Sequence, residues 1–223
     1  MYELLERYFE NTSYAQFSRD LAEKDTVILL RDESTARVAG FSTLMKVPAL
    51  VDGRQVVGFF SGDTIIAREH WGSSLLGRLW LETVFGETDR IQRHSPETAC
   101  YWLLISSGYK TWRYLPIFFH AYAPHPQVAP SPFDRQVLRA LARAKFGDEY
   151  HPDLGIVRFR AANPLRAGVA EITAQRLRDP LIEFFARQNP GHAQGDELVC
   201  VASICRSNLT RAGHRLLEQE GAR

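Results

Sequence analysis

The sequence predicts an α/β fold with a mixed, mostly antiparallel central sheet and flanking helices. Between residues 27 and 66, apolar runs rich in β-branched and aromatic residues alternate with turn signals, which is typical of consecutive antiparallel strands. A helical spacing of apolar residues follows at 75–84, and another buried strand follows at 99–105. Because a helix joins these last two strands, they should run parallel, and the sheet is therefore mixed.

The N-terminal part holds two short amphipathic pieces between residues 2 and 21, separated by Asn11-Thr12-Ser13, which offers an N-cap to the second piece. Strands at 27–30 and 38–44 flank a polar turn and form a hairpin. Asp52-Gly53 is a strong turn signal before the strand that begins at Val56. Three consecutive antiparallel strands are therefore expected.

The stretch from residue 56 to 85 joins a strand to a helix through the polar turn 68–74, with Gly72 inside it. A strand, a glycine turn and a helix N-terminus present free backbone N–H groups and the positive end of the helix dipole. Phosphate or pyrophosphate is a natural ligand of such a junction, and Gly72 would let the backbone approach it closely. The alternative is an ordinary strand-to-helix connection, which any α/β protein contains.

Beyond the helix, residues 86–97 are polar and are expected to form a loop or a short helix. Residues 123–132 contain four prolines and should form a stiff loop. We divide the chain into a core at 1–122, this proline-rich loop at 123–132, and a C-terminal α/β extension at 133–223 that completes or covers the sheet. The elements expected in the extension are helices at 133–146, 177–188 and 208–218 and strands at 155–159 and 198–204.

Composition indicates an ordinary globular protein: 45% of the residues are hydrophobic and 24% are charged. Twenty-seven Lys and Arg against 26 Asp and Glu leave a net charge of +1, which disfavours nucleic-acid and anionic-membrane partners. No signal peptide is recognisable, and no apolar run approaches the roughly 18 residues of a membrane span. Cys100, Cys200 and Cys205 have apolar neighbours and no metal-type spacing, so we expect reduced, buried thiols in a cytoplasmic protein.

Two motifs resemble the GNAT superfamily of acyltransferases. The turn at 68–76 is similar to its acyl-CoA-binding pattern, Arg/Gln-x-x-Gly-x-Gly/Ala, through Arg68, Gly72 and the run from Ser73 to Leu76, although His70 or Trp71 stands in place of the first glycine. Ser107 and Tyr114 keep the seven-residue spacing of a GNAT asparagine and tyrosine, with serine in place of asparagine. The expected element order over residues 21–122 also matches the GNAT layout.

The resemblance implies transfer of an acyl group from acetyl-CoA, a longer acyl-CoA or an acyl carrier to a small-molecule amine, in a V-shaped cleft between the strands at 56–66 and 99–105. It implies that Tyr114 is the general acid for the departing thiolate. It further implies that backbone amides near Ile65 and Ile66 face the thioester carbonyl. The residues that it assigns to cofactor binding are Ile65, Ile66, Arg68, Trp71, Gly72, Ser73, Ser74 and Ser107.

Asp63, Glu69 and His70 lie near the strand end and are candidate general bases; as alternatives, each is a solvated turn residue, and Tyr114 is a core aromatic. Asp196-Glu197 either grips a cationic acceptor or forms a plain turn. No metal site is expected, because no histidine or cysteine spacing supports one. The departures from both motifs leave a second hypothesis open, a non-catalytic GNAT-like ligand-binding module. The oligomeric state is also open, a homodimer included.

Overall fold

The computed structural model describes residues 1–218 and confirms the predicted fold class. An eight-stranded sheet has the order β1-β2-β3-β4-β8-β7-β6, with β5 beside β8. Only β3 and β4 pair in parallel, so the sheet is mixed and mostly antiparallel. The strands are β1 Thr26–Arg31, β2 Val38–Val51, β3 Arg54–Ile66, β4 Ala99–Ser106, β5 Tyr122–Ala123, β6 Tyr150–His151, β7 Ile156–Val157 and β8 Glu197–Ser203.

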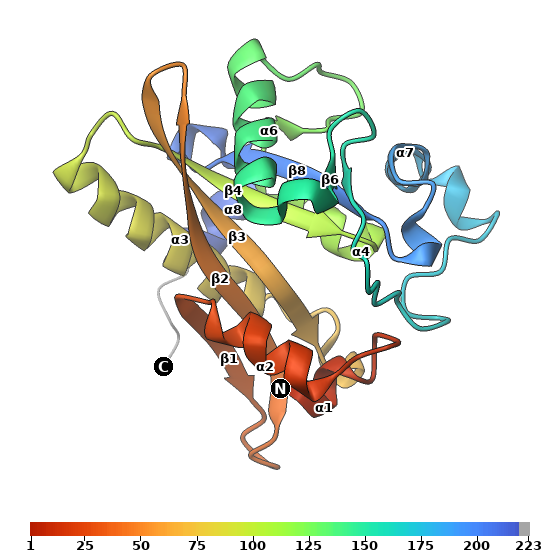
Figure 1. Cartoon of the computed structure of the whole chain (residues 1–223). Helices are drawn as coiled ribbons and strands as arrows, with labels where there is room; N and C mark the ends of the chain where they lie inside the picture. The colour runs from red at the N-terminus through yellow and green to blue at the C-terminus, as the bar shows by residue number, and fades with distance from the viewer. Residues whose placement is uncertain (219–223) are drawn as a thin grey trace.

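Helices cover both faces of the sheet (Figure 1). One face packs against α3, α4, α5, α7 and α8, and the other against α1, α2 and α6. We call the second the α2/α6 face. The helices are α1 Tyr2–Leu5, α2 Tyr14–Ala22, α3 Leu75–His94, α4 Tyr109–Trp112, α5 Tyr114–Phe118, α6 Pro132–Phe146, α7 Pro180–Gln188 and α8 Arg211–Glu218.

Several boundaries differ from the sequence-based expectation. Helix α3 continues to His94 where a loop or short helix was expected, because Thr88 is buried and Ile91 packs on the core. Helix α7 begins only at Pro180, since Asp179 accepts the N–H of Leu181 at 2.9 Å and caps it. The strand expected at 155–159 shortens to β7, and the helix expected from residue 208 begins at Arg211.

The sheet interior is closely packed on both sides. Leu81 and Val84 of α3 are fully buried in one cluster with Phe59 and Trp102. On the opposite face, α6 approaches β3 so closely that a Cβ on Gly58 would lie 2.8 Å from Cδ1 of Leu141. Glycine at this position therefore lets the helix rest directly on the strand.

The C-terminal part shares this sheet instead of forming one of its own. Strand β8 lies between β4 and β7, and Cys200 within it is fully buried. Cys100 is also buried, but Cys205 is exposed just beyond β8, so the expectation of three buried thiols was wrong for that residue. No helix within residues 1–218 has the length and apolarity needed to cross a membrane.

Candidate functional site

Strands β3 and β4 are paired at one end and separate at the other. Their parallel pairing runs from Val56 opposite Ala99 to Ser61 opposite Leu104 and then stops. Beyond that point β3 continues beside β2, while β4 continues beside β8. We call the space between residues 62–66 of β3 and the end of β4 the cleft.

A β-bulge lies where the strands separate. Thr64 pairs with Ser42, yet Ser61 pairs with Leu44, so Gly62 and Asp63 together oppose the single residue Thr43. A bulge of this kind bends its strand and increases the local twist. It therefore turns the end of β3 away from β4 and re-aims the Asp63 side chain.

The edge of β3 that faces the cleft carries backbone groups released from β4. Ala67 N–H donates to Ala39 O at 2.8 Å, and Ile65 lies opposite Phe41. Since N–H direction alternates along an antiparallel strand, Ile65 bonds to β2, whereas the N–H groups of Thr64 and Ile66 point into the cleft. Of the two amides expected there, Ile66 is at the cleft and Ile65 is in the sheet.

The turn between β3 and α3 forms the mouth of the cleft. Gly72 has φ +101°, and a Cβ there would meet nothing, so glycine is required by backbone conformation and not by a crowded neighbour. Ser73 Oγ accepts the Leu75 N–H at 3.3 Å, while Ser74, the N-cap of α3, makes no side-chain cap bond. The N–H groups that follow, in the first turn of α3, have no carbonyl partner within the helix and form the positive end of its dipole.

Three cationic side chains gather beside this turn. Lys110 Nζ lies 3.8 Å from the centre of the Trp71 ring, and the Arg68 guanidinium lies 5.4 Å from it. Burial lowers the pKa of Lys110, and the charges of Arg176 and Arg68 lower it further. Arg68 and Trp71 were predicted from the sequence, but Lys110 and Arg176 were not, because no local pattern shows that distant segments meet.

Tyr114 lies deeper in the cleft, on α5. Together with Thr64 of β3, Leu76 of α3 and Leu104 of β4 it lines a cavity of about 30 Å³. Its hydroxyl has no hydrogen-bond partner within residues 1–218, and burial raises its pKa. Ser107 is only 6% exposed at the end of β4.

Two carboxyl groups with raised pKa values, Asp63 and Glu197, lie on the α2/α6 side of the cleft. Asp63 is half-buried at the bulge, and burial raises its pKa to about 6 against the opposing effect of Lys24. Glu197 begins β8, and burial followed by the charge of Asp63 raises its pKa to about 8. Asp196 is committed elsewhere, since it forms a bidentate ion pair with Arg158. The tertiary structure thus distinguishes the two residues of Asp196-Glu197: Asp196 is paired with Arg158, whereas the pKa of Glu197 responds to the charge of Asp63.

Glu69 and His70 do not join this pair. They lie on the 3-10 turn Arg68–His70, where Glu69 is 3.9 Å from Arg7 and His70 is 3.5 Å from Asp32. Both are therefore held on the outside of the turn. No cluster of three His, Cys, Asp or Glu side chains within the described part of the chain is arranged to hold a metal ion.

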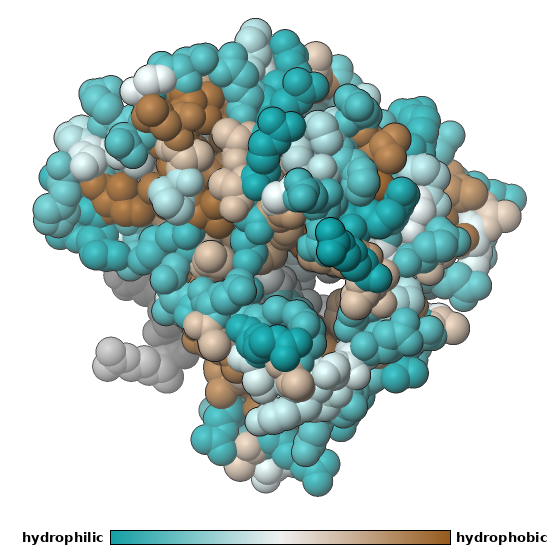
Figure 2. Space-filling model, viewed as in Figure 1, coloured by the Kyte–Doolittle hydropathy of each residue, from teal (hydrophilic) through white to brown (hydrophobic). Residues whose placement is uncertain are grey.

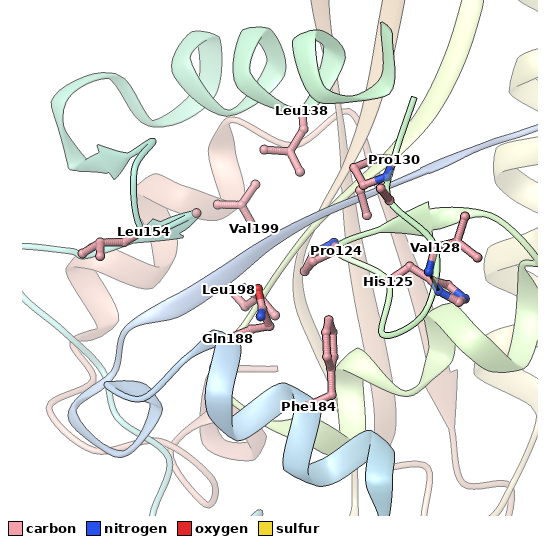
Figure 3. Close-up of a pocket in the computed structure, with 13 residues that line it drawn as sticks. Pro124, His125, Val128, Pro130, Leu138, Leu154, Phe184, Gln188, Leu198 and Val199 are labelled. Atoms are coloured by element: carbon pink, nitrogen blue, oxygen red, sulfur yellow. Dashed lines mark hydrogen bonds between the residues drawn. The ribbon is translucent and has the colours of Figure 1, made fainter. Parts of the chain in front are cut away.

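A larger cavity, of about 230 Å³, lies at the outer edge of β8 (Figure 3). Its walls come from Leu138 of α6, from Phe184 and Gln188 of α7, and from the proline-rich loop with His125. Three features of the cleft do not line this cavity: Asp63 and Glu197 (the carboxylate pair), the N-terminus of α3, and Arg68, Lys110 and Arg176 (the cationic cluster). The larger cavity is therefore separate from the chemistry of the cleft.

No protein-family model matches the chain, and no curated protein matches its sequence. A solved structure that resembles part of it is a GNAT family N-acetyltransferase (YhbS) from Escherichia coli, crystallised in complex with CoA. The two chains are 20% identical, with a TM-score of 0.33, and the likeness covers 50% of this chain and 58% of that one. This chain thus spans little more than half of the length of the solved structure that it matches. The description of the fold rests on the order and direction of this chain's own strands.

Proposed function

We propose that this protein transfers an acyl group from an acyl-CoA to a small-molecule amine at the cleft between β3 and β4. One observation carries the proposal: β3 leaves β4 at a bulge, beside a helix N-terminus and between the cationic cluster and the carboxylate pair. The residues supply what acyl transfer requires, namely donors for the carbonyl, a base for the amine and an acid for the thiolate.

The mouth of the cleft suits the phosphate groups of CoA. The first turn of α3 offers N–H groups and the helix dipole, and Arg68, Lys110 and Arg176 add three positive charges. Repulsion between these cations is relieved when an anion binds among them. Trp71, whose Nε1 donates to Ile66 O at 2.9 Å, links this cluster to the cleft edge of β3.

The thioester supplies the activated acyl group, and in this proposal the N–H groups of Thr64 and Ile66, which point into the cleft, polarise its carbonyl. At neutral pH Asp63, with a pKa near 6, is mostly ionised and can accept the amine proton. Glu197, with a pKa near 8, is mostly protonated and keeps a second negative charge out of the site. Tyr114, which lines the inner cavity and has no hydrogen-bond partner in the described chain, is the proton donor to the leaving thiolate in this proposal.

A second candidate is a non-catalytic module that binds an anionic ligand at the mouth. The inner cleft holds a cavity of only about 30 Å³, close to the volume of a single water molecule. Trp80 and Trp102 fill much of this region, and their indole N–H groups donate to Ser61 Oγ at 2.8 and 2.9 Å. An acyl chain can enter only if side chains of α5 move.

Calorimetry with CoA and acetyl-CoA tests both candidates. We expect Lys110→Gln to weaken CoA binding about 5- to 10-fold, since it removes one of the cations at the mouth. Lys46→Gln is the matched control, because Lys46 is paired with Glu87 on a different part of the surface. Absence of CoA binding by the parent would reject the acyltransferase. Binding without turnover on a panel of amines would support the non-catalytic module.

A further inference from the structure

Lys24 places its amine at the bulge of β3. It follows α2, and its Cε lies 2.9 Å, and its Nζ 3.6 Å, from the position that a Cβ on Gly62 would occupy. Nζ also lies 5.5 Å from the centre of the Phe60 ring. Glycine at position 62 is what gives this side chain access to the backbone where β3 leaves β4.

A second lysine provides a natural comparison. Lys145 Nζ lies 5.6 Å from the same Phe60 ring, but it is held by Glu23 at 2.7 Å. Lys24 forms no ion pair within 4.0 Å among the described residues. Its pKa is lowered by burial first and then by Lys145, while the charges of Asp63, Glu23 and Asp20 act in the opposite direction. A larger share of Lys24 is therefore neutral, and so nucleophilic, than of an exposed lysine.

A buried polar group without a hydrogen-bond partner lies beside Lys24, at the same point of the bulge. Thr43 Oγ1 lies 2.7 Å from the same Cβ position on Gly62, is fully buried, and has no hydrogen-bond partner in the described chain. A buried hydroxyl without a partner costs free energy and is commonly satisfied by a water or a ligand. The space around the bulge is thus suited to a polar group that the chain itself does not supply.

We propose that Lys24 is a self-acylation site, at which the enzyme transfers an acyl group from acyl-CoA to its own side chain. This inference rests on the proposed acyl-CoA site. The neutral Nζ attacks the thioester carbonyl carbon, a C–N bond forms, and the C–S bond breaks. The nitrogen loses its proton to the Asp63 carboxylate, and CoA departs as a thiolate that takes a proton from Tyr114 or from water.

The product is an amide, which reacts with water far more slowly than the thioester does. Each chain is therefore modified once, and the acylated side chain then occupies the α2/α6 side of the bulge, where a free amine would have to enter. Figure 2 shows this face hollowed between the part formed by α1 and α2 and the part formed by α6. Self-acylation is expected to slow transfer to added amines.

Intact-protein mass spectrometry after incubation with acetyl-CoA tests the proposal, followed by peptide mapping. We expect a gain of one acetyl group per chain, located on Lys24. Lys24→Arg should abolish this gain, and Lys145→Arg, over the same ring, should retain it. Asp63→Asn should slow its appearance at least 10-fold.

Calorimetry with CoA on the same preparations separates the two proposals. CoA binding without acetylation of Lys24 would overturn self-acylation and leave the acyl-CoA site standing. Absence of CoA binding would remove both. Acetyl groups spread over exposed lysines, or the same gain in Lys24→Arg, would mean ordinary chemical acetylation and would also overturn the proposal.

Discussion

The two ends of the β3–β4 pair are built differently. At the paired end Val56 and Leu103 are fully buried and Phe59 is 2% exposed, so the strands there belong to the packed core. At the open end Asp63, Thr64 and Ile66 are half-buried, with polar groups that face the cleft. One pair of strands thus provides stability at one end and candidate chemistry at the other, with the bulge at Gly62 and Asp63 as the boundary.

Among the variants that test this difference between the two ends, Asp63→Asn is expected to have the largest effect. If Asp63 accepts the amine proton, the amide removes the base, and turnover should fall about 10³-fold. The melting temperature should not fall, because the change removes a buried charge that folding disfavours. Steady-state kinetics and thermal melting check this, with Asp89→Asn on the exposed side of α3 as the control. Full turnover in Asp63→Asn would show that the open end has another base.

The next effect concerns the paired end. Leu103→Ala should lower the free energy of unfolding by about 3 kcal/mol, since it opens a cavity in a fully buried site. Thr64→Ala at the open end, which loses one hydrogen bond to Ser42, should cost about 1 kcal/mol or less. Urea unfolding measures both. Equal losses in the two variants would contradict the proposed division of roles.

Tyr114→Phe tests the acid. The change keeps the ring that packs on Phe118 and removes only the hydroxyl. We expect turnover to fall on the order of 10²-fold, with CoA affinity and melting temperature nearly unchanged, because the hydroxyl has no partner in the described chain. Slow hydrolysis of acyl-CoA can serve as the assay if no acceptor is known. A variant that melts lower yet turns over normally would identify Tyr114 as a core aromatic.

The last effect is a pH dependence of stability. Glu197 has its pKa raised from 4.5 to about 8 and Asp63 from 3.8 to about 6, so the folded state holds protons that the unfolded state has already lost. Stability should therefore fall as pH rises from about 4 to 8. Glu197→Gln should remove the upper part of this fall, so the variant should be more stable than the parent at pH 8. Urea unfolding at several pH values measures it, and an unchanged slope in the variant would refute the raised pKa.

The candidate site was only partly predictable. Arg68, Trp71 and Gly72 could be found because a strand, a turn and a helix N-terminus follow one another along the chain, and Tyr114 because it keeps a spacing from Ser107. Lys24 and Lys110 could not be found, since each reaches the cleft through packing between segments far apart in the sequence. Glu197 was named only together with Asp196, and the sequence could not separate the two. Glu69 looked equivalent to Asp63 in the sequence, yet the 3-10 turn directs it outward to Arg7.

The sequence by itself determined the class of fold, because apolar periodicity and turn residues act over a few neighbours and distinguish strands from helices locally. It also determined the parallel direction of β3 and β4, because a helix lies between them. Only the tertiary structure decided where that pairing stops. The bulge depends on the register of β3 against β2, and the burial that raises the pKa values of Asp63 and Glu197 comes from elements that meet only in the folded chain.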